Sequence, residues 1–312
     1  MRPTRHLTAV LLLAAISAVG CSKRGDFSQT KAESADTAQA KPGTTSGESL
    51  VLKPTDDEGF GANATPKITG PVTFADGKAA YDAKNYSDAT AIFELYTGRR
   101  PDNAWGHYML GLSAWKSGDL TKAESAFEKA LSIDPHHVKS LVNLSRVFID
   151  QKRNDDALDR LTRAAEIEPG STEVYRLLGR TYHAQGRTDE AVEAYRRAIE
   201  LNELDAWSMN NLGLLLLETQ RADEALPLLA KAVGLRKDVP AFHNNLGMAL
   251  EHTGRFRAAA TAYNAALTAD PGYDKAKQNL ARVEAVKEDR EEPFEIDEAA
   301  KRSVEGTRDL GR

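Results

Sequence analysis

Histidine and cysteine are the side chains that most often ligate metals or act as nucleophiles, and this chain has few of them. It contains seven histidines and one cysteine. His136 and His137 are adjacent and follow Pro135, but no acidic or thiol side chain stands at ligand spacing, so we expect ordinary solvated residues. His107 and His243 occupy equivalent positions in helical segments, and we expect both to be packed imidazoles.

The motifs of the common catalytic sites are missing from the sequence. There is no glycine-rich phosphate cradle, no nucleophile elbow and no His and carboxylate pair at metalloprotease spacing. Catalysis needs such groups to converge on a preformed site. We therefore expect no catalytic residue, no metal and no cofactor, and a protein that is not an enzyme. The net charge of −5 also gives no general attraction for nucleic acid.

Cys21 is the one residue whose surroundings indicate a covalent reaction. It has no internal disulfide partner, because no other cysteine exists. Upstream lie Arg2 and Arg5 and then an apolar run from Leu7 to Val19. That run is too short to span a bilayer and is shaped like a signal peptide.

The residues that end this run, 18–21, are Ala-Val-Gly-Cys, and they resemble the bacterial lipobox. The resemblance implies that residues 1–20 are a cleaved lipoprotein signal peptide and that Cys21 is acylated. Because Ser22 rather than aspartate follows, it also implies an outer-membrane location facing the periplasm, with the membrane bound through the lipid anchor only. An ordinary secretory signal or an uncut N-terminal anchor are the alternatives.

Two further segments lack the apolar content needed to order themselves. Residues 21–69 are rich in Ser, Thr, Ala, Gly, Asp and Lys, and we predict a disordered tether. Residues 291–312 form a charged tail that we also predict to be disordered, although its Pro-Phe-Glu-Ile stretch at 293–296 is a candidate docking motif.

A 34-residue period organises the chain between these segments. One register holds small residues: Gly77, Gly111, Ser145, Gly179, Gly213, Gly247 and Ala281. Twelve residues later a second register holds only alanine: Ala89, Ala123, Ala157, Ala191, Ala225 and Ala259. Small residues at a fixed period let two helices pack closely, which is the signature of a helical solenoid, a binding scaffold far more often than a catalyst.

Other registers resemble the tetratricopeptide repeat consensus. Leucine recurs at 110, 144, 178, 212 and 246, bulky side chains at 93, 127, 161, 195, 229 and 263, and proline at 101, 135, 169 and 271. The resemblance covers residues 70–273. It implies an all-α, right-handed superhelical solenoid of six helix-turn-helix repeats, followed by a capping helix at residues 274–290.

In that family the second, fifth, ninth and twelfth positions of each first helix line a concave surface, where a protein or peptide ligand binds. Repeat 2 places aromatic and apolar residues there, repeat 5 does the same, and the repeats between them add positive charge. The residues that the resemblance therefore predicts to bind a partner are Trp105, Tyr108, Leu112, Trp115, Arg146, Arg176, Arg180, Trp207 and Leu214, together with the ladder-like asparagines Asn211 and Asn245.

Two alternatives for these side chains stay open. Aromatic stripes at helical spacing are usually core, so Trp105 and Trp115 are equally compatible with packing against a neighbouring repeat.

The function expected is a lipid-anchored scaffold that binds a protein partner during assembly of an envelope machine such as a pilus or secretion system. The alternative functions are peptidoglycan or glycan binding and a protease-adaptor role. Enzymatic activity is a further alternative.

Overall fold

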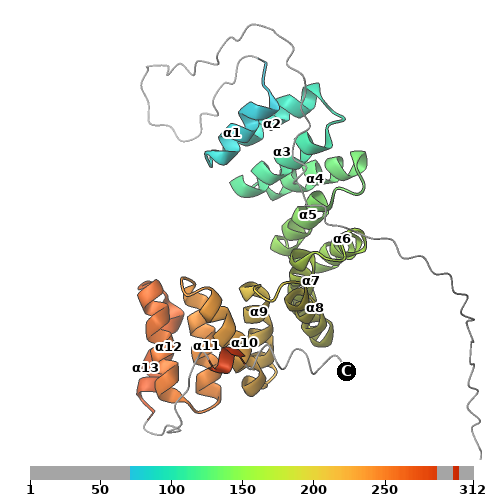
Figure 1. The fold of residues 1–312 in the computed structure, drawn as a ribbon. Helices are drawn as coiled ribbons and strands as arrows, with labels where there is room; N and C mark the ends of the chain where they lie inside the picture. Colours follow the sequence, from blue (N-terminus) through green and yellow to red (C-terminus); the bar gives the residue numbers. More distant parts are fainter. Residues whose placement is uncertain (1–70, 287–297, 302–312) are drawn as a thin grey trace, which may run out of the picture. The chain divides into compact units, whose positions relative to one another are not determined.

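The computed structural model describes residues 71–286 and 298–301, and the thirteen helices between Phe74 and Glu284 alternate between two roles (Figure 1). The first helices of the pairs are α1 (Phe74–Asp82), α3 (Ala104–Ser117), α5 (Val138–Asp150), α7 (Thr172–Ala184), α9 (Ala206–Glu218), α11 (Pro240–His252) and α13 (Asp274–Glu284). The second helices are α2 (Tyr86–Arg99), α4 (Leu120–Ile133), α6 (Asn154–Ile167), α8 (Thr188–Leu201), α10 (Ala222–Leu235) and α12 (Phe256–Ala269).

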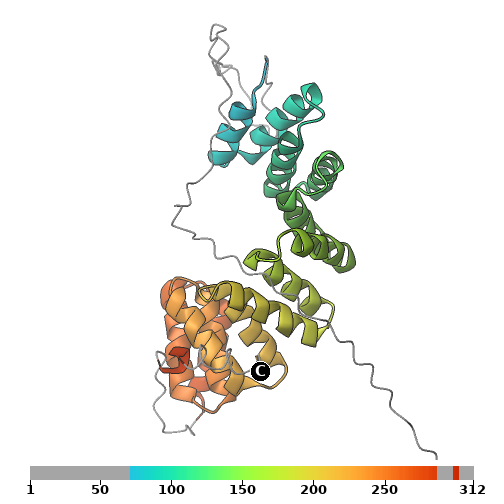
Figure 2. The ribbon, with the colours of Figure 1, turned by 45° about the vertical axis from the view of Figure 1, so that its right-hand side comes forward.

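Each helix packs against the helix before it and the helix after it (Figures 1 and 2). Each first helix also contacts the first helix of the next pair, from α1 with α3 to α11 with α13. The predicted all-α solenoid is therefore confirmed. No helix among the described residues is both long and apolar enough to cross a bilayer. Cys21 and the segments predicted to be a signal peptide and a tether lie outside the described residues.

The 34-residue registers mark where the two helices of a pair pack together. All six alanines of the second register are fully buried. In the first register, each glycine faces the bulky side chain sixteen residues later. A Cβ built on Gly111 would lie 2.7 Å from the Phe127 ring, and one on Gly179 would lie 2.6 Å from the Tyr195 ring. The ring occupies the space of a side chain, so the glycine is required for packing.

The last member of that register behaves differently. Ala281 is exposed, because no second helix packs over α13 in the part of the chain that the structure describes. Instead, α13 buries Ala276 and Val283 against the preceding pair. The helix ends at Glu284, six residues before the limit of the predicted capping helix at 290.

A third register, which the sequence analysis did not identify, forms the turn inside each pair. Six residues spaced by 34 adopt a left-handed backbone: Lys84, Gly118, Lys152, Gly186, Gln220 and Gly254. Their φ angles lie between 62° and 90°. Three of the six are glycine, the residue that tolerates this conformation best, and that recurrence was the available signal.

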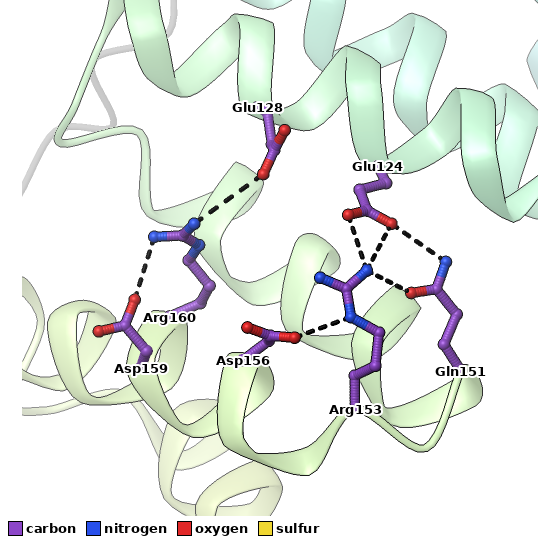
Figure 3. Close-up of polar contacts among 7 residues, drawn as sticks. All are labelled: Glu124, Glu128, Gln151, Arg153, Asp156, Asp159 and Arg160. Carbon is purple, nitrogen blue, oxygen red and sulfur yellow. Dashed lines mark hydrogen bonds and ion pairs between the residues drawn. The ribbon is translucent and has the colours of Figure 1, made fainter.

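Successive second helices are linked by charged side chains (Figure 3). Arg153, at the start of α6, donates from Nη1 to both carboxylate oxygens of Glu124 on α4, at 2.8 and 2.9 Å, and from Nε to Asp156 at 2.7 Å. Arg160 pairs with Glu128 of α4 at 3.9 Å and with Asp159 at 3.0 Å. Because these charged groups are largely solvated, their ion pairs contribute little to stability. They help to align the two repeats.

The described part of the charged tail contains one short helical turn. Residues 298–301 are helical, and Ala299, which is 9% exposed, belongs to the apolar cluster formed by α8 to α13. The prediction of disorder throughout 291–312 is therefore wrong for these four residues, because Ala299 has apolar surface to pack against. Residues 291–297 and 302–312 lie outside the described residues.

Candidate binding groove

A pocket of about 620 Å³ opens on the first helices of the N-terminal repeats. Four of the residues predicted to bind a partner line it, namely Tyr108, Leu112 and Trp115 of α3 and Arg146 of α5. The remaining lining residues are Tyr81, Lys116, Val138, Lys139, Val142, Asn143, Glu168, Ser171 and Glu173. We call this pocket the N-terminal groove. It brings aromatic, aliphatic and charged side chains from α1, α3, α5 and α7 to one surface.

Trp115 forms a fixed, half-buried wall of the N-terminal groove. Its indole Nε1 donates to Asp150 Oδ2 on α5 at 2.9 Å. Lys116 Nζ lies 4.6 Å from the centre of the ring. The indole thus bonds to the neighbouring repeat and also lines the groove, and its role in binding a partner stays a prediction.

Tyr108 lines the groove from a buried position, since it is only 8% exposed. Burial raises the pKa of its hydroxyl, so it remains a neutral donor and acceptor at physiological pH. The ring centre lies 5.5 Å from that of Trp105. Trp105 is 48% exposed and lies beside the groove rather than among its lining residues, with Lys139 Nζ 5.2 Å from its ring centre. The exposed part of the Trp105 ring is therefore accessible to a ligand at the rim of the N-terminal groove.

His137 corrects a prediction from the sequence. It is buried, at 7% exposure, and not solvated, because its ring packs against Trp105 and Tyr108 at 4.7 and 5.1 Å between centres. Its Nδ1 accepts the backbone N–H of Ser140 at 3.2 Å and so caps α5. Burial lowers the pKa of this imidazole. The neutral form, which can accept that hydrogen bond, is thereby favoured.

Two other histidines behave largely as expected. His107 is buried, and its Nε2 lies 2.9 Å from the carbonyl oxygen of Pro101. His243 is half-buried and makes the same contact with the carbonyl oxygen of Lys237 at 2.9 Å. Within residues 71–286 and 298–301, no three His, Cys, Asp or Glu side chains are grouped so that they could hold a metal ion.

The predicted basic centre is largely neutralised by acids of the next repeat. Arg146 of α5 forms an ion pair with Glu173 of α7 and donates to Asn143 at 3.2 Å. Arg176 of α7 donates to both carboxylate oxygens of Asp205 at 2.8 and 3.0 Å, and Asp205 is only 5% exposed. The positive charge of both arginines, which the sequence analysis assigned to the concave surface, is therefore balanced by a carboxylate of the next repeat. Acids that begin one first helix lie opposite the arginines of the preceding first helix.

Three cations of this region keep their charge available. Arg180 is exposed on α7 and forms no ion pair with any described residue. Lys116, near the end of α3, and Lys139, near the start of α5, line the N-terminal groove, are also exposed and have no carboxylate partner in the described part of the chain. The usable positive charge of the groove therefore comes from two lysines that the sequence analysis did not select.

The predicted asparagine ladder is present, but its members bind one another. Asn245 Nδ2 donates to Asn210 Oδ1 at 2.9 Å, and Asn279 Nδ2 donates to Asn244 Oδ1 at 2.9 Å. Asn211 accepts from Asn210 at 3.4 Å. These amides link α9, α11 and α13. The role of Asn211 and Asn245 in holding a ligand backbone stays a prediction, and the Asn245 side chain already donates to Asn210.

The remaining predicted residues of repeat 5 are not gathered into the N-terminal groove. Trp207 is 44% exposed and packs one edge against Phe242 of α11, with ring centres 4.9 Å apart. Leu214 is half-buried on α9. Leu217 and Ile149, which share the predicted stripe, are buried at 3% and 9% exposure. The twelfth position thus lines a groove in repeat 2 and is core in repeats 3 and 5.

Besides the two lysines, the sequence analysis also missed lining residues from the first repeat and from a turn. Tyr81 occupies the twelfth position of the first repeat, so the rule used for repeats 2 to 5 finds it once it is applied there. Glu168 and Ser171 come from the turn between α6 and α7. No helical periodicity reports on turn residues, so no signal of that kind was available.

Comparison with known families agrees with this geometry. Models of the tetratricopeptide repeat match residues 74–138, 114–181, 179–220 and 210–274, which together span 74–274, more than half of the chain. Among curated proteins, tetratricopeptide repeat protein 37 of Xenopus laevis is 35% identical over 80 residues, covering 24% of this chain and only 5% of that protein.

Solved structures show the same architecture. Pseudomonas aeruginosa PilF superposes with a TM-score of 0.54 at 20% identity, over 69% of this chain and 94% of that one. The Cut9–Hcn1 hetero-tetramer of the APC/C gives 0.58 at 18% identity, over 75% of this chain and 45% of that one. A thermophilic tetratricopeptide repeat protein of Thermus thermophilus gives 0.50 at 22% identity, over 59% of this chain and 100% of that one. At these identities the likeness concerns the fold alone.

Proposed function

Because this chain belongs to the tetratricopeptide repeat family, we propose that it is a non-enzymatic scaffold that binds an extended segment of a protein partner in the N-terminal groove. The observation that carries the proposal is the groove itself, about 620 Å³ in volume with Tyr81, Tyr108 and Trp115 among its lining residues. Aromatic side chains that line a concavity are typical anchors for a protein ligand.

The position of the groove supports a partner of modest length. It lies on α1, α3, α5 and the start of α7, whereas asparagines of α9, α11 and α13 are bonded to one another. Amides that already have partners gain little by exchanging them for a ligand. We therefore assign recognition to the N-terminal repeats and a structural role to the asparagines.

Capture of the partner from a lysate tests the groove. Trp115→Ala removes a wall of the groove, and we expect it to weaken capture by about 2 kcal/mol in a subsequent titration against the captured partner. Leu95→Ala is the matched control, because Leu95 is an exposed apolar residue of α2, at 41% exposure, outside the groove. Equal capture by both variants, with both folded, would move recognition off the groove.

We further propose that the scaffold is a lipoprotein of the bacterial cell envelope, anchored in the outer membrane through Cys21 and facing the periplasm, where it assists assembly of a machine such as a pilus or secretion system. The support is the signal-like run that ends at Cys21 and the lipobox resemblance. Labelling cells with an alkyne palmitate tests the anchor. Labelling of the wild-type chain and none of Cys21→Ala is the expected result, and equal labelling of both contradicts it.

One observation favours a second candidate, glycan binding. Trp105 and Trp207 are about half exposed, and an exposed indole is also a platform for a sugar ring. Pull-down on purified peptidoglycan decides between the two. Retention that Trp105→Ala and Trp207→Ala abolish, with no loss of protein capture in Trp115→Ala, would favour the glycan.

A further inference from the structure

The N-terminal groove combines an apolar floor with charged side chains. Leu112, Val138 and Val142 supply the apolar surface. Lys116, near the end of α3, and Lys139, near the start of α5, also line it, without carboxylate partners among the described residues. A ligand that satisfies all of these groups carries a large apolar side chain with carboxylates on both sides of it.

This chain itself contains a segment of that chemistry. Residues 291–298 read Glu-Glu-Pro-Phe-Glu-Ile-Asp-Glu, with two large apolar side chains, Phe294 and Ile296, among five carboxylates. Proline favours an extended backbone in the residue before it, here Glu292. A short extended segment with an aromatic residue between acids matches the aromatic walls and the two lysines of the groove.

The segment cannot reach the groove of its own chain. Phe294 precedes Glu298 by four residues, so it lies within about 14 Å of that residue. Glu298 begins the helical turn in which Ala299 packs into the apolar cluster of α8 to α13. Figures 1 and 2 both draw this turn against the last helices of the array. Packed helix axes lie about 8–10 Å apart. Because α7 and α9 lie between α5 and α11, the groove on α5 is about 25–30 Å from a turn that packs at α11.

We propose that residues 291–298 of a second copy of this chain occupy the N-terminal groove. The proposal rests on the proposed function, since it requires that the groove binds an extended protein segment. Phe294 fills the apolar floor, and carboxylates on either side pair with Lys116 and Lys139. Because the groove lies on α1, α3, α5 and the start of α7, and Glu298 begins a turn packed with α8 to α13, the contact is head-to-tail and is able to extend to further copies.

Binding of a synthetic peptide with the sequence of residues 289–299 tests the contact directly. Titration into the full chain, followed by tryptophan fluorescence, is expected to show saturable binding that a Phe294→Ala peptide weakens at least tenfold. The double variant Lys116→Glu and Lys139→Glu is expected to weaken it similarly, while Lys129→Glu, an exposed lysine of α4 outside the groove, leaves it unchanged. A dissociation constant weaker than about 1 mM for the wild-type peptide overturns the proposal.

Sedimentation of the intact chain tests the consequence. Wild type is expected to associate as its concentration rises, and the lysine double variant is expected to stay monomeric. A second variant, Glu292→Lys with Glu295→Lys, also stays monomeric alone but associates when mixed with the lysine variant, because the charges are then exchanged. If wild type remains monomeric, the contact between copies is overturned. If Trp115→Ala nevertheless loses a captured partner, the proposed function still stands. A foreign acidic segment is then the occupant.

Discussion

At the scale of single residues, the small residues of the repeat are required by direct contact. Gly179 lies under the Tyr195 ring, whereas Gly234 of α10 has no atom within 4 Å of a Cβ built on it. Both glycines are helical. Helix propensity alone favours alanine over glycine by about 0.5–1 kcal/mol at either position. Packing therefore decides whether replacing the glycine by alanine raises or lowers the free energy of unfolding at each site.

We expect Gly179→Ala to lower the free energy of unfolding by about 1–3 kcal/mol, because the added methyl overlaps the Tyr195 ring. Gly234→Ala is expected to raise it by up to about 1 kcal/mol. Urea denaturation followed by circular dichroism measures both. A gain in stability for Gly179→Ala would show that the Tyr195 ring moves away at little cost.

The two arginines on the same face of α7 differ in their ion pairs: Arg176 pairs with Asp205, whereas Arg180 has no ion pair with a described residue. Arg176→Glu places a second carboxylate beside the buried Asp205, and we expect a loss of about 2 kcal/mol or more. Arg180→Glu changes an exposed side chain without an ion pair among the described residues, and we expect a change of less than about 0.5 kcal/mol. Thermal melts of the two variants compare them. Equal melting temperatures would mean that the pair of Arg176 and Asp205 contributes nothing in solution.

The buried imidazole of His137 predicts a dependence of stability on pH. Burial lowers its pKa below the ordinary 6.5, an effect that Asp134 partly opposes and Lys139 reinforces. The unfolded chain then binds more protons than the folded chain below pH 6.5. Stability due to His137 is therefore fully present above pH 6.5 and is lost as the pH falls through the folded-state pKa.

His137→Asn tests this dependence, since asparagine also caps a helix but does not titrate. We expect the free energy of unfolding of the variant to fall less than that of wild type between pH 7 and pH 5. His136→Asn, the exposed neighbour, serves as the control. Parallel curves for wild type and His137→Asn would show that the imidazole is not desolvated in solution.

At the scale of elements, α13 closes the array although no second helix follows it in the described residues. Its Asn279 donates to Asn244 at 2.9 Å, and its Arg282 donates to Glu251 at 2.6 and 2.8 Å, both acceptors lying on α11. Val283 is 3% exposed and Val286, just past the helix, is 40% exposed. One face of the helix is thus core and the other is solvated.

We expect Val283→Asp to cost about 2–4 kcal/mol, because a carboxylate would be buried against α11 and α12 without a partner. Val286→Asp is the matched control and is expected to cost less than about 0.5 kcal/mol. Chemical denaturation followed by circular dichroism compares them. Equal effects would place α13 away from the repeat that precedes it.

At the scale of the described array, the main contacts of each helix are with its neighbours along the chain, and each first helix also contacts the first helix of the next pair. Stability of such an array is a sum of repeat and interface contributions, so damage at one end need not reach the other. In Val283→Asp we expect amide hydrogens of α11 and α13 to exchange faster while those of α3 and α5 keep their protection. Hydrogen exchange with mass spectrometry resolves this. Uniform loss of protection would indicate a single cooperative unit.

The sequence by itself determined the fold and part of the N-terminal groove. A 34-residue period of glycine and alanine leaves no room for any arrangement other than close helix pairs, as the contact of Gly111 with Phe127 shows. The stripe of repeat 2 placed Tyr108, Leu112 and Trp115 on one surface because side chains three and four residues apart share a helix face.

Only the tertiary structure decided which charges remain available. Glu173 lies 27 residues beyond Arg146 and Asp205 lies 29 beyond Arg176, so each pair joins two successive first helices. Whether such groups meet depends on the rotation of one first helix relative to the next, which periodicity within a helix does not specify. The same rotation buries Leu217 while it leaves Trp115 on the groove.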